Sequence, residues 1–196
     1  MGKHIIGLTG PTGSGKSTLS PIAKELGFFV IDADAVAKKC TEIGSPLLEK
    51  LEAAFHNILN DDGSLNRKTL ARKAFVESEK TELLNSIMLP YISEKIQGII
   101  DLADAEYFLL DAPTLYEAGS DRLCETVIGV LCDKKDRLNR IIARDNITED
   151  DAKIRINAGK DDEFYKTRCQ HIIYNKGDQG EFISQAARIL EAIKEK

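Results

Sequence analysis

The segment 10–17, GPTGSGKS, has the spacing of a phosphate-binding loop, G-x-x-x-x-G-K-[ST]. Its glycines let the backbone fold tightly, so that successive N–H groups point inward and form a nest for anionic oxygens. Lys16 would bring a mobile positive charge to the outer phosphates of a nucleotide, and Ser17 a hydroxyl for Mg²⁺. A chance glycine-rich turn is the alternative, but the apolar strand before the loop and the helix after it favour phosphate binding. These residues suit phosphoryl transfer from ATP with Mg²⁺.

Two carboxylates, Asp32 and Asp34, come just after the next apolar run. Their side chains point the same way if the strand continues, and diverge if a helix begins at Ala33. A kinase needs a carboxylate near the attacking hydroxyl, to accept its proton and hold it in line. Asp32 could instead cap a helix at 33–39, a common use of Asp. We favour Asp34 as the base, and the choice between the two stays open.

A third carboxylate, Asp111, ends the apolar run Phe108-Leu109-Leu110. An acid in this position usually contacts magnesium, directly or through water. Any strand can end in Asp, so assigning Asp111 to a magnesium site depends on the phosphate-binding loop elsewhere in the chain.

Arginines recur at Arg137, Arg140 and Arg144, on one face of an expected helix. Such a face can close over phosphates as a lid and stabilise the charge being transferred. A solvated basic face is the alternative. The lid is favoured by further basic residues in an otherwise acidic chain, namely Arg155, Lys160, Lys166 and Arg168.

Short apolar runs alternate with helical patterns, which predicts an α/β fold with a parallel sheet covered on both faces. The expected strands are His4–Thr9, 28–32, Tyr107–Asp111, 126–132 and His171–Tyr174. Ligands of such sheets sit at the carboxyl ends of the strands, so the loops after Thr9, Asp32, Asp111 and Tyr174 should share one rim. The expected helices are 16–26, Pro46–Phe55, 67–76, 83–87, 91–102, 136–143, 150–157 and 181–194.

Local signals refine this outline. Pro21 should cause a kink or a local adjustment in the first helix, and Pro90 should interrupt the long helical block. The residues Asn60-Asp61-Asp62-Gly63 mark a turn. Thr148 and Asp151 have the spacing of a capping box.

Composition limits the classes of function. The chain has 196 residues and a formal net charge of −5, which argues against binding a nucleic-acid backbone. Its four cysteines form no C-x-x-C pair, so we expect reduced thiols. We find no secretory signal and no apolar run long enough for a membrane helix. We therefore expect a cytoplasmic protein that acts on a small molecule, as a monomer, with an oligomer left open.

The stretch Asn175-Lys176-Gly177-Asp178 matches N-K-x-D, the guanine-reading motif of GTPase switches. A switch would also need D-x-x-G after a strand, but Thr114 stands where that glycine belongs. The long helical block is also foreign to a minimal switch. We therefore keep the switch only as a less favoured alternative.

Taken together, these segments resemble the dephospho-coenzyme A kinase family over nearly the whole chain. The motifs stand in the family's order: GLTGPTGSGKS, IDADAVA, LNRKTLARKAF, LLNSIMLPYI, DAPTLYEAG, R-x-x-R-x-x-x-R and IIYNKGD. Many kinases share the phosphate-binding loop, but the D-A-D acids and the stretch from Asp111 to Glu117 are more specific. The resemblance also accounts for Asn175, because the family ends a strand with N-x-G here, near the adenine.

The resemblance implies one domain, 1–196, with a three-layer fold on a five-stranded parallel sheet. A helical acceptor-binding lobe would span 60–103, and a helical lid 137–168. The implied reaction transfers the γ-phosphate of ATP to the ribose 3′-hydroxyl of dephospho-coenzyme A, the last step of coenzyme A synthesis. Another small-molecule kinase of the same architecture is the alternative.

Residue by residue, the resemblance implies catalytic roles for Asp34, Lys16 and Arg140, with Mg²⁺ at Ser17. Acceptor contacts would come from Thr9, Asp32, Arg67 and Asp111. The nucleotide would contact Gly10, Pro11, Thr12, Gly13, Ser14, Gly15, Lys16, Ser17, Thr18, Arg144 and Asn175.

Some positions depart from the family's pattern. Leu89 stands where the family commonly has His before Pro90, and Gln is common at the position of Arg137 and near Gly159. The family's D-x-P-L-L-x-E is here DAPTLYE. These departures fall on the acceptor and lid sides, so they bear on the acceptor's identity more than on the phosphoryl chemistry. In the acceptor lobe, Lys68 and Lys73 are expected to be a solvated helix face.

Overall fold

The computed structural model describes residues 2–195, which divide into two compact units. The first unit contains the residues up to Ile31 and those from Asp104 onward. The second unit, Asp32–Ala103, includes the whole segment 60–103 that the sequence suggests as an acceptor lobe.

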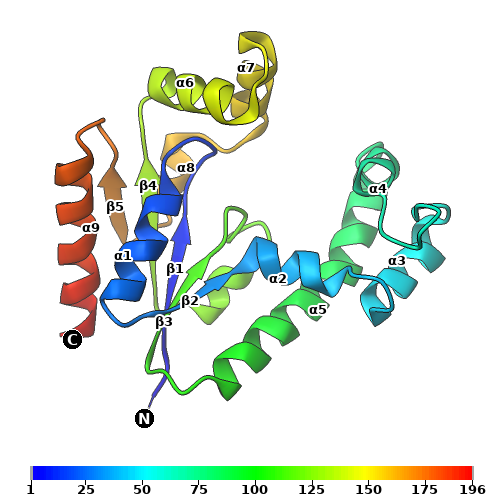
Figure 1. Cartoon of the computed structure of the whole chain (residues 1–196), viewed down its shortest axis with the longest axis horizontal. Helices are drawn as coiled ribbons and strands as arrows, with labels where there is room; N and C mark the ends of the chain where they lie inside the picture. Colours follow the sequence, from blue (N-terminus) through cyan, green and yellow to red (C-terminus); the bar gives the residue numbers. More distant parts are fainter. Residues whose placement is uncertain (1, 196) are drawn as a thin grey trace. The chain divides into compact units, whose positions relative to one another are not determined.

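The first unit is built on a five-stranded sheet in the order β2-β3-β1-β4-β5 (Figure 1). The strands are β1 (His4–Thr9), β2 (Phe29–Asp32), β3 (Tyr107–Asp111), β4 (Thr126–Leu131) and β5 (His171–Tyr174). The central strand β1 pairs in parallel with β3 and β4, and β4 pairs in parallel with β5. The predicted α/β class and the five parallel strands are confirmed.

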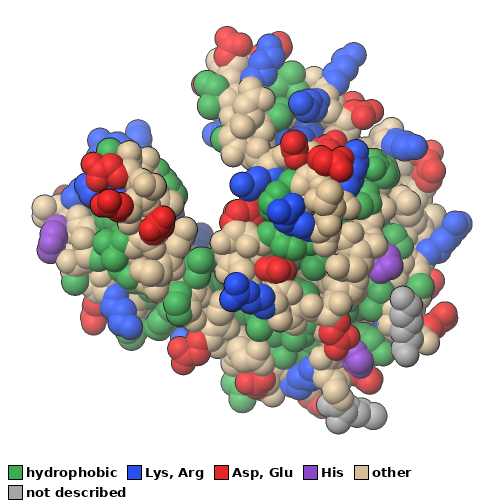
Figure 2. Space-filling view, turned by 180° about the vertical axis from the view of Figure 1, so that it is seen from behind, with side chains coloured by type: hydrophobic (Ala, Val, Ile, Leu, Met, Phe, Trp, Pro, Cys, Tyr) green, Lys and Arg blue, Asp and Glu red, His purple; other side chains and the backbone are tan. Residues whose placement is uncertain are grey.

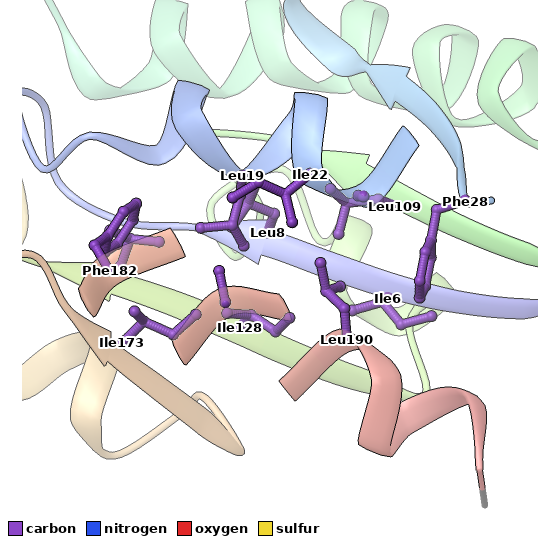
Figure 3. Close-up of a cluster of buried hydrophobic side chains, with 13 residues drawn as sticks. Ile6, Leu8, Leu19, Ile22, Phe28, Leu109, Ile128, Ile173, Phe182 and Leu190 are labelled. Carbon is purple, nitrogen blue, oxygen red and sulfur yellow. The ribbon is translucent and has the colours of Figure 1, made fainter. Parts of the chain in front are cut away.

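The main core of this unit lies between the sheet and two helices, α1 (Leu19–Glu25) and α9 (Gln179–Lys194). Ile6 and Leu8 of β1 point to the same face because side chains alternate along a strand. Figure 3 shows them with Leu109, Ile128 and Ile173 of neighbouring strands, packed against side chains of α1 and α9. Each large side chain buried in this way contributes about 1.5–3 kcal/mol. This packing fixes the carboxyl ends of the strands and the loops that follow them.

The first helix begins later than the sequence pattern predicts. Residues Lys16–Thr18 form a 3₁₀ turn, η1, and the α-helical bonds of α1 start only at Leu19. Pro21 is therefore in the first turn of α1, where a backbone N–H has no partner inside the helix. Pro21 removes no interior hydrogen bond, which explains why it is tolerated there.

Three more helices complete the site side of the first unit: α6 (Lys134–Asp145), α7 (Glu149–Ala158) and α8 (Asp162–Lys166). A short 3₁₀ helix, η2 (Ser120–Leu123), precedes β4. Thr148 caps α7 as expected, because its hydroxyl accepts from the N–H of Asp151 at 3.2 Å.

The second unit is helical and has its own core. Its helices are α2 (Ala33–Cys40), α3 (Pro46–Phe55), α4 (Arg67–Ala74) and α5 (Ser78–Leu102). The predicted turn after Asn60 is present, with Gly63 N donating to Asn60 O at 2.9 Å. The buried residues between the helices are Cys40, Leu47, Leu51, Phe55, Ile58, Leu70, Ala74 and Leu84.

The expected break at Pro90 is wrong, because α5 runs through it as one helix of 25 residues. An interior proline costs a helix about 3 kcal/mol, since it removes a bond and crowds the preceding turn. Here α5 is held by contacts with α2, α3 and α4. Packing of this kind outweighs the local preference of the proline.

On the face seen in Figure 2, Lys and Arg side chains are interspersed with Asp and Glu. All four cysteines are free thiols, as the sequence predicts. Within residues 2–195, no helix is both long and apolar enough to span a membrane.

Candidate active site

The phosphate-binding loop joins the end of β1 to η1, and its glycines are required by geometry. Gly13 and Gly15 have φ angles of 77° and 96°, in the left-handed region where only glycine is unstrained. A Cβ added to Gly15 would lie 2.3 Å from Nδ2 of Asn175, and one added to Gly13 would lie 2.9 Å from the carbonyl oxygen of Arg137. Neighbouring segments therefore press directly against the loop.

The carbonyl side of the loop is held by Arg140 and Asn175. Arg140 Nη1 and Asn175 Nδ2 both donate to Ser14 O, at 3.1 and 3.0 Å. Arg140 Nη2 also donates to Asn175 Oδ1 at 3.1 Å. In a trans peptide the C=O and the next N–H point in opposite directions. Fixing the Ser14 carbonyl toward Arg140 therefore turns the Gly15 N–H to the other side of the loop, as an anion nest requires.

Lys16 and Asp111 lie together at the ends of the loop and of β3. Lys16 Nζ is 3.4 Å from Asp111 Oδ1, and their side chains are only 15% and 17% exposed. Ser20 Oγ, on α1, donates to Asp111 Oδ2 at 2.9 Å. The carboxylate thus has one oxygen beside the lysine and the other fixed by the hydroxyl. Ser17 is exposed one residue along from the lysine.

Thr9 is completely buried at the end of β1. Its hydroxyl donates to Pro113 O at 3.2 Å, so it ties the end of β1 to the loop after β3. The loops that follow Asp111 and Tyr174 therefore lie beside the phosphate-binding loop, which itself follows Thr9. The predicted topology requires this shared edge.

Arg144 differs from Arg140 in its surroundings. Its guanidinium is paired with Asp145, with Nε at 2.7 Å from Oδ1, and Arg155 pairs with the other oxygen of the same carboxylate. The hydrogen bond from Arg144 holds the pKa of the Asp145 carboxyl below its usual range. Asp145 therefore stays ionised at neutral pH and holds two arginines at the junction of α6 and α7. A nucleotide contact from Arg144 stays a prediction.

The two carboxylates after β2 take different positions in the second unit. Asp32 caps α2, with Oδ1 accepting from Ala35 N at 2.9 Å, and Asp34 is exposed in the first turn of that helix. The helix begins at Ala33, so the two side chains diverge. The Asp32 carboxylate is therefore engaged at the start of α2, while the role of Asp34 as base stays a prediction.

The expected acceptor residues of the second unit have contacts of their own. Arg67 Nη2 donates to Thr41 Oγ1 at 2.9 Å, which ties α4 to the end of α2. Lys73 donates to the carbonyls of Phe55 and His56 at the end of α3, so the expectation that it is simply solvated is wrong.

A cavity of about 390 Å³ adjoins this part of the second unit. Three cations and an apolar floor line it, in a protein of net negative charge. The lining residues are Ala54, Phe55, Arg72, Lys73, Val76, Lys80 and Leu83.

Two residues of the phosphate-binding region were missed in the sequence. Ser20 orients Asp111 from a helix where it reads as an ordinary polar position. Cys132 lies against Arg140, whose Nη1 is 3.4 Å from its sulfur. Burial raises the pKa of the Cys132 thiol, and the nearby Arg140 offsets this only in part, so the thiol stays neutral beside the arginine. Neither contact has a local sequence signal, because each joins residues of different elements.

The guanine-reading interpretation of 175–178 loses its basis here. Asp178 would be the residue that reads guanine, but its Oδ1 accepts from Glu181 N at 2.9 Å and caps α9. Asn175 is committed to the phosphate-binding loop through Ser14.

A parallel sheet with a phosphate-binding loop after its central strand, and a lysine and a carboxylate beside that loop, defines a P-loop kinase, a phosphotransferase. The dephospho-CoA kinase family model matches residues 4–181. The chain belongs to the dephospho-CoA kinase family. Members of this family phosphorylate dephospho-CoA in the final step of coenzyme A synthesis.

Individual relatives agree with this assignment. A dephospho-CoA kinase from Corynebacterium efficiens is 41% identical over 96% of both chains. One from Fusobacterium nucleatum is 33% identical over 98% of this chain and 100% of its own.

Solved structures share the fold. A dephospho-CoA kinase from Campylobacter jejuni superposes with a TM-score of 0.70, at 29% identity over 97% of each chain. A protein from Thermus thermophilus gives a TM-score of 0.88, at 26% identity over 98% of each chain. A shikimate kinase from Bacteroides thetaiotaomicron is only 17% identical, with a TM-score of 0.54, and supports the fold alone.

Proposed function

We propose that this protein transfers the γ-phosphate of ATP to the ribose 3′-hydroxyl of dephospho-coenzyme A, giving coenzyme A and ADP. The observation that carries the proposal is the family match over residues 4–181 in a chain whose phosphate-binding loop is intact. In the reaction, the 3′-oxygen forms a bond to the γ-phosphorus while the bond from that phosphorus to the β,γ-bridging oxygen breaks. ADP leaves with the electrons of that bond.

The nucleotide phosphates are bound by the loop and by Lys16. Three features support this role: the positive φ angles of the loop glycines, the outward-facing carbonyls, and the lysine held beside Asp111. Lys16 leaves Asp111 for the outer phosphates when the nucleotide binds, exchanging one anionic partner for another. Arg140 steadies the loop, and Arg140 and Arg144 add positive charge near the group being transferred.

The residues present also fit a magnesium ion. Mg²⁺ takes oxygen ligands and is usually held by one or two protein groups together with substrate phosphates. Ser17 offers an exposed hydroxyl, and Asp111 offers a carboxylate oriented by Ser20. Ser17 would hold the ion with Asp111 contributing directly or through water. When bound, the ion supplies positive charge to the phosphate oxygens.

Asp34 is the proposed general base, which accepts the proton of the 3′-hydroxyl. The capping role of Asp32 supports this choice, because the Asp32 carboxylate already accepts a hydrogen bond from the N–H of Ala35. Thr9 and Asp32 are further proposed contacts of the acceptor.

The second unit binds the acceptor. Dephospho-coenzyme A carries a pyrophosphate, and arginine offers the best geometry for phosphate oxygens. Arg67 is the proposed contact, and three further cations, Arg72, Lys73 and Lys80, line a cavity of the same unit. The segment 137–168 is the proposed lid.

We also propose that the protein acts in the cytoplasm, on a free small molecule and as a monomer. The four unpaired thiols suit a reducing compartment. Light scattering coupled to gel filtration measures the oligomeric state: a mass of one chain is expected, and a larger mass would contradict it.

A coupled ADP-release assay tests the function. Dephospho-coenzyme A is compared with plain nucleosides, nucleoside monophosphates and shikimate at equal concentrations, with ATP and Mg²⁺. The proposal expects kcat/KM for dephospho-coenzyme A to exceed the others by at least about 10³-fold, a preference of about 4 kcal/mol. A preference for any other acceptor would overturn it.

A further inference from the structure

Arg137, the first arginine of α6, is one of the largest fully buried side chains in the described part of the chain. Only 2% of it is exposed. Moving a charged group out of water is costly unless it is paired and hydrogen-bonded. Stability alone therefore gives no reason for an arginine at this position.

The contacts of Arg137 are few and specific. Nε donates to Thr12 O, in the phosphate-binding loop, at 3.0 Å. Nη1 is 3.7 Å from Oδ1 of Asp162, at the start of α8. Among the described residues, Nη2 has no hydrogen-bond partner, and neither has Asp162 Oδ1. A buried ion pair whose polar atoms lack some of their hydrogen bonds stabilises a fold poorly. The hydrogen bond from Arg137 to Thr12 is therefore the contact that has a clear effect on the loop.

That consequence follows from peptide geometry. The Thr12 carbonyl and the Gly13 N–H belong to one trans peptide and point in opposite directions. By holding the carbonyl toward α6, Arg137 turns the Gly13 N–H toward the opposite side of the loop. Arg140 and Asn175 do the same for the Gly15 N–H through Ser14 O. The two arginines thus orient two N–H donors of one anion nest.

Gly13 allows the phosphate-binding loop to lie close to α6, because it has no side chain. A Cβ at Gly13 would lie 2.9 Å from the backbone oxygen of Arg137 and 3.1 Å from the side chain of Ile141. The loop and α6 are therefore in direct contact, and the guanidinium of Arg137 donates to Thr12 at this contact.

We propose that Arg137 is a positioning residue for the phosphate-binding loop, that it orients the Gly13 N–H toward the nucleotide phosphates, and that Asp162 holds Arg137 in place from α8. The inference rests on the proposed function in one respect only, that this loop binds nucleotide. It does not depend on which acceptor is phosphorylated.

The test measures nucleotide binding rather than turnover, so that failure of the acceptor assignment cannot be mistaken for failure of this inference. Mg²⁺ with a non-hydrolysable ATP analogue is titrated into the full chain by calorimetry. The variants are Arg137→Met, which removes charge and donors at similar volume, Arg137→Gln, which keeps an amide donor without the charge, and Arg137→Lys, which keeps the charge and an ammonium donor but loses the planar guanidinium. Arg188→Met, an exposed arginine on α9, is the matched control.

The expected result is a dissociation constant raised roughly tenfold or more in Arg137→Met, the scale of one hydrogen bond from a charged donor. Arg137→Gln and Arg137→Lys should recover part of the loss, because each keeps an N–H donor, and Arg188→Met should stay within about twofold of the original chain. Asp162→Asn should weaken binding less, and its effect should vanish in the Arg137→Met background, because the two act in series.

A second measurement separates positioning from simple stability. The amide signal of Gly13 in ¹H–¹⁵N spectra should shift in the Arg137 variants, and nucleotide should move it less than in the original chain. If Arg137→Met is folded and binds the analogue within twofold of the original chain, with Gly13 unmoved, the inference is wrong. It is equally wrong if the variants lose thermal stability but their folded fraction binds normally.

Discussion

The side-chain amide of Asn175 donates to the backbone oxygen of Ser14 at 3.0 Å, joining the end of β5 to a loop 161 residues earlier in the chain. The same amide accepts from Arg140 at 3.1 Å, and only 8% of Asn175 is exposed. This one side chain therefore links the phosphate-binding loop, β5 and α6.

Replacing Asn175 by Ala should destabilise the protein and weaken nucleotide binding together. Arg140 would lose an acceptor in a buried setting, which costs about 1–3 kcal/mol. Urea unfolding measures the change in the free energy of unfolding, and calorimetry measures nucleotide affinity. Asn85→Ala, at an exposed position of α5, is the control and should leave both within error or slightly raise stability, since Ala favours helix. A stable Asn175→Ala variant with normal affinity would contradict the structural role.

The roles of Asp32 and Asp34 can be separated by the same chemical change at each. Asp34→Asn should lower kcat by roughly 10²-fold or more with little change in KM, because it removes the proton acceptor. Asp32→Asn should keep both stability and most activity, since Asn caps helices about as well as Asp. Steady-state kinetics on both variants decide the matter. A larger kcat loss in Asp32→Asn would move the base to Asp32.

The proposed lid should respond to nucleotide unevenly along its length. In α6, Arg137 and Ile141 are buried, and in α8 Tyr165 is 4% exposed, whereas α7 buries only Ala152. Segments with few buried contacts open at low free energy. Hydrogen exchange with and without an unreactive ATP analogue should therefore show the largest gain in protection at α7. Equal protection of α7 in both states would count against a lid.

Acceptor binding should depend on one cation of the second unit more than on the others. Arg67→Ala should raise KM for dephospho-coenzyme A about tenfold and leave KM for ATP near its original value, as expected for a charge-assisted hydrogen bond to the acceptor. Lys68→Ala, at an exposed neighbouring position, is the control and should change neither. Arg72→Ala provides the contrast, because Arg72 lines the cavity. A larger rise in KM for Arg72→Ala would transfer the contact to that residue.

The sequence was most informative where chemistry is encoded locally. Apolar runs ending in Thr9 and Asp111 predict the strands and their shared edge, and the spacing of Gly10, Gly15 and Lys16 predicts the loop. The capping roles of Asp32 and Thr148 could also be predicted from the sequence, since a cap needs only a polar residue before a helix.

Contacts that join distant parts of the chain could not be predicted from the sequence. Nothing near Ser20 indicates that its hydroxyl meets Asp111, and nothing near Arg137 indicates a buried side chain rather than an exposed lid face. Pro90 gives a local signal for a helix break, but packing of α5 against α2, α3 and α4 overrides it. In each case the deciding interaction is tertiary, so no window of sequence contains it.

The identity of the product tests the central claim most directly. The protein is incubated with ATP, Mg²⁺ and dephospho-coenzyme A, and the product is analysed by mass spectrometry and ³¹P NMR, with Lys16→Ala as the inactive control. The account predicts one added phosphate on the ribose 3′-oxygen and one ADP released per phosphate transferred, with Lys16→Ala below about a tenth of the original rate, a loss of more than ~1.4 kcal/mol. Normal ATP binding with no phosphate on dephospho-coenzyme A would contradict it.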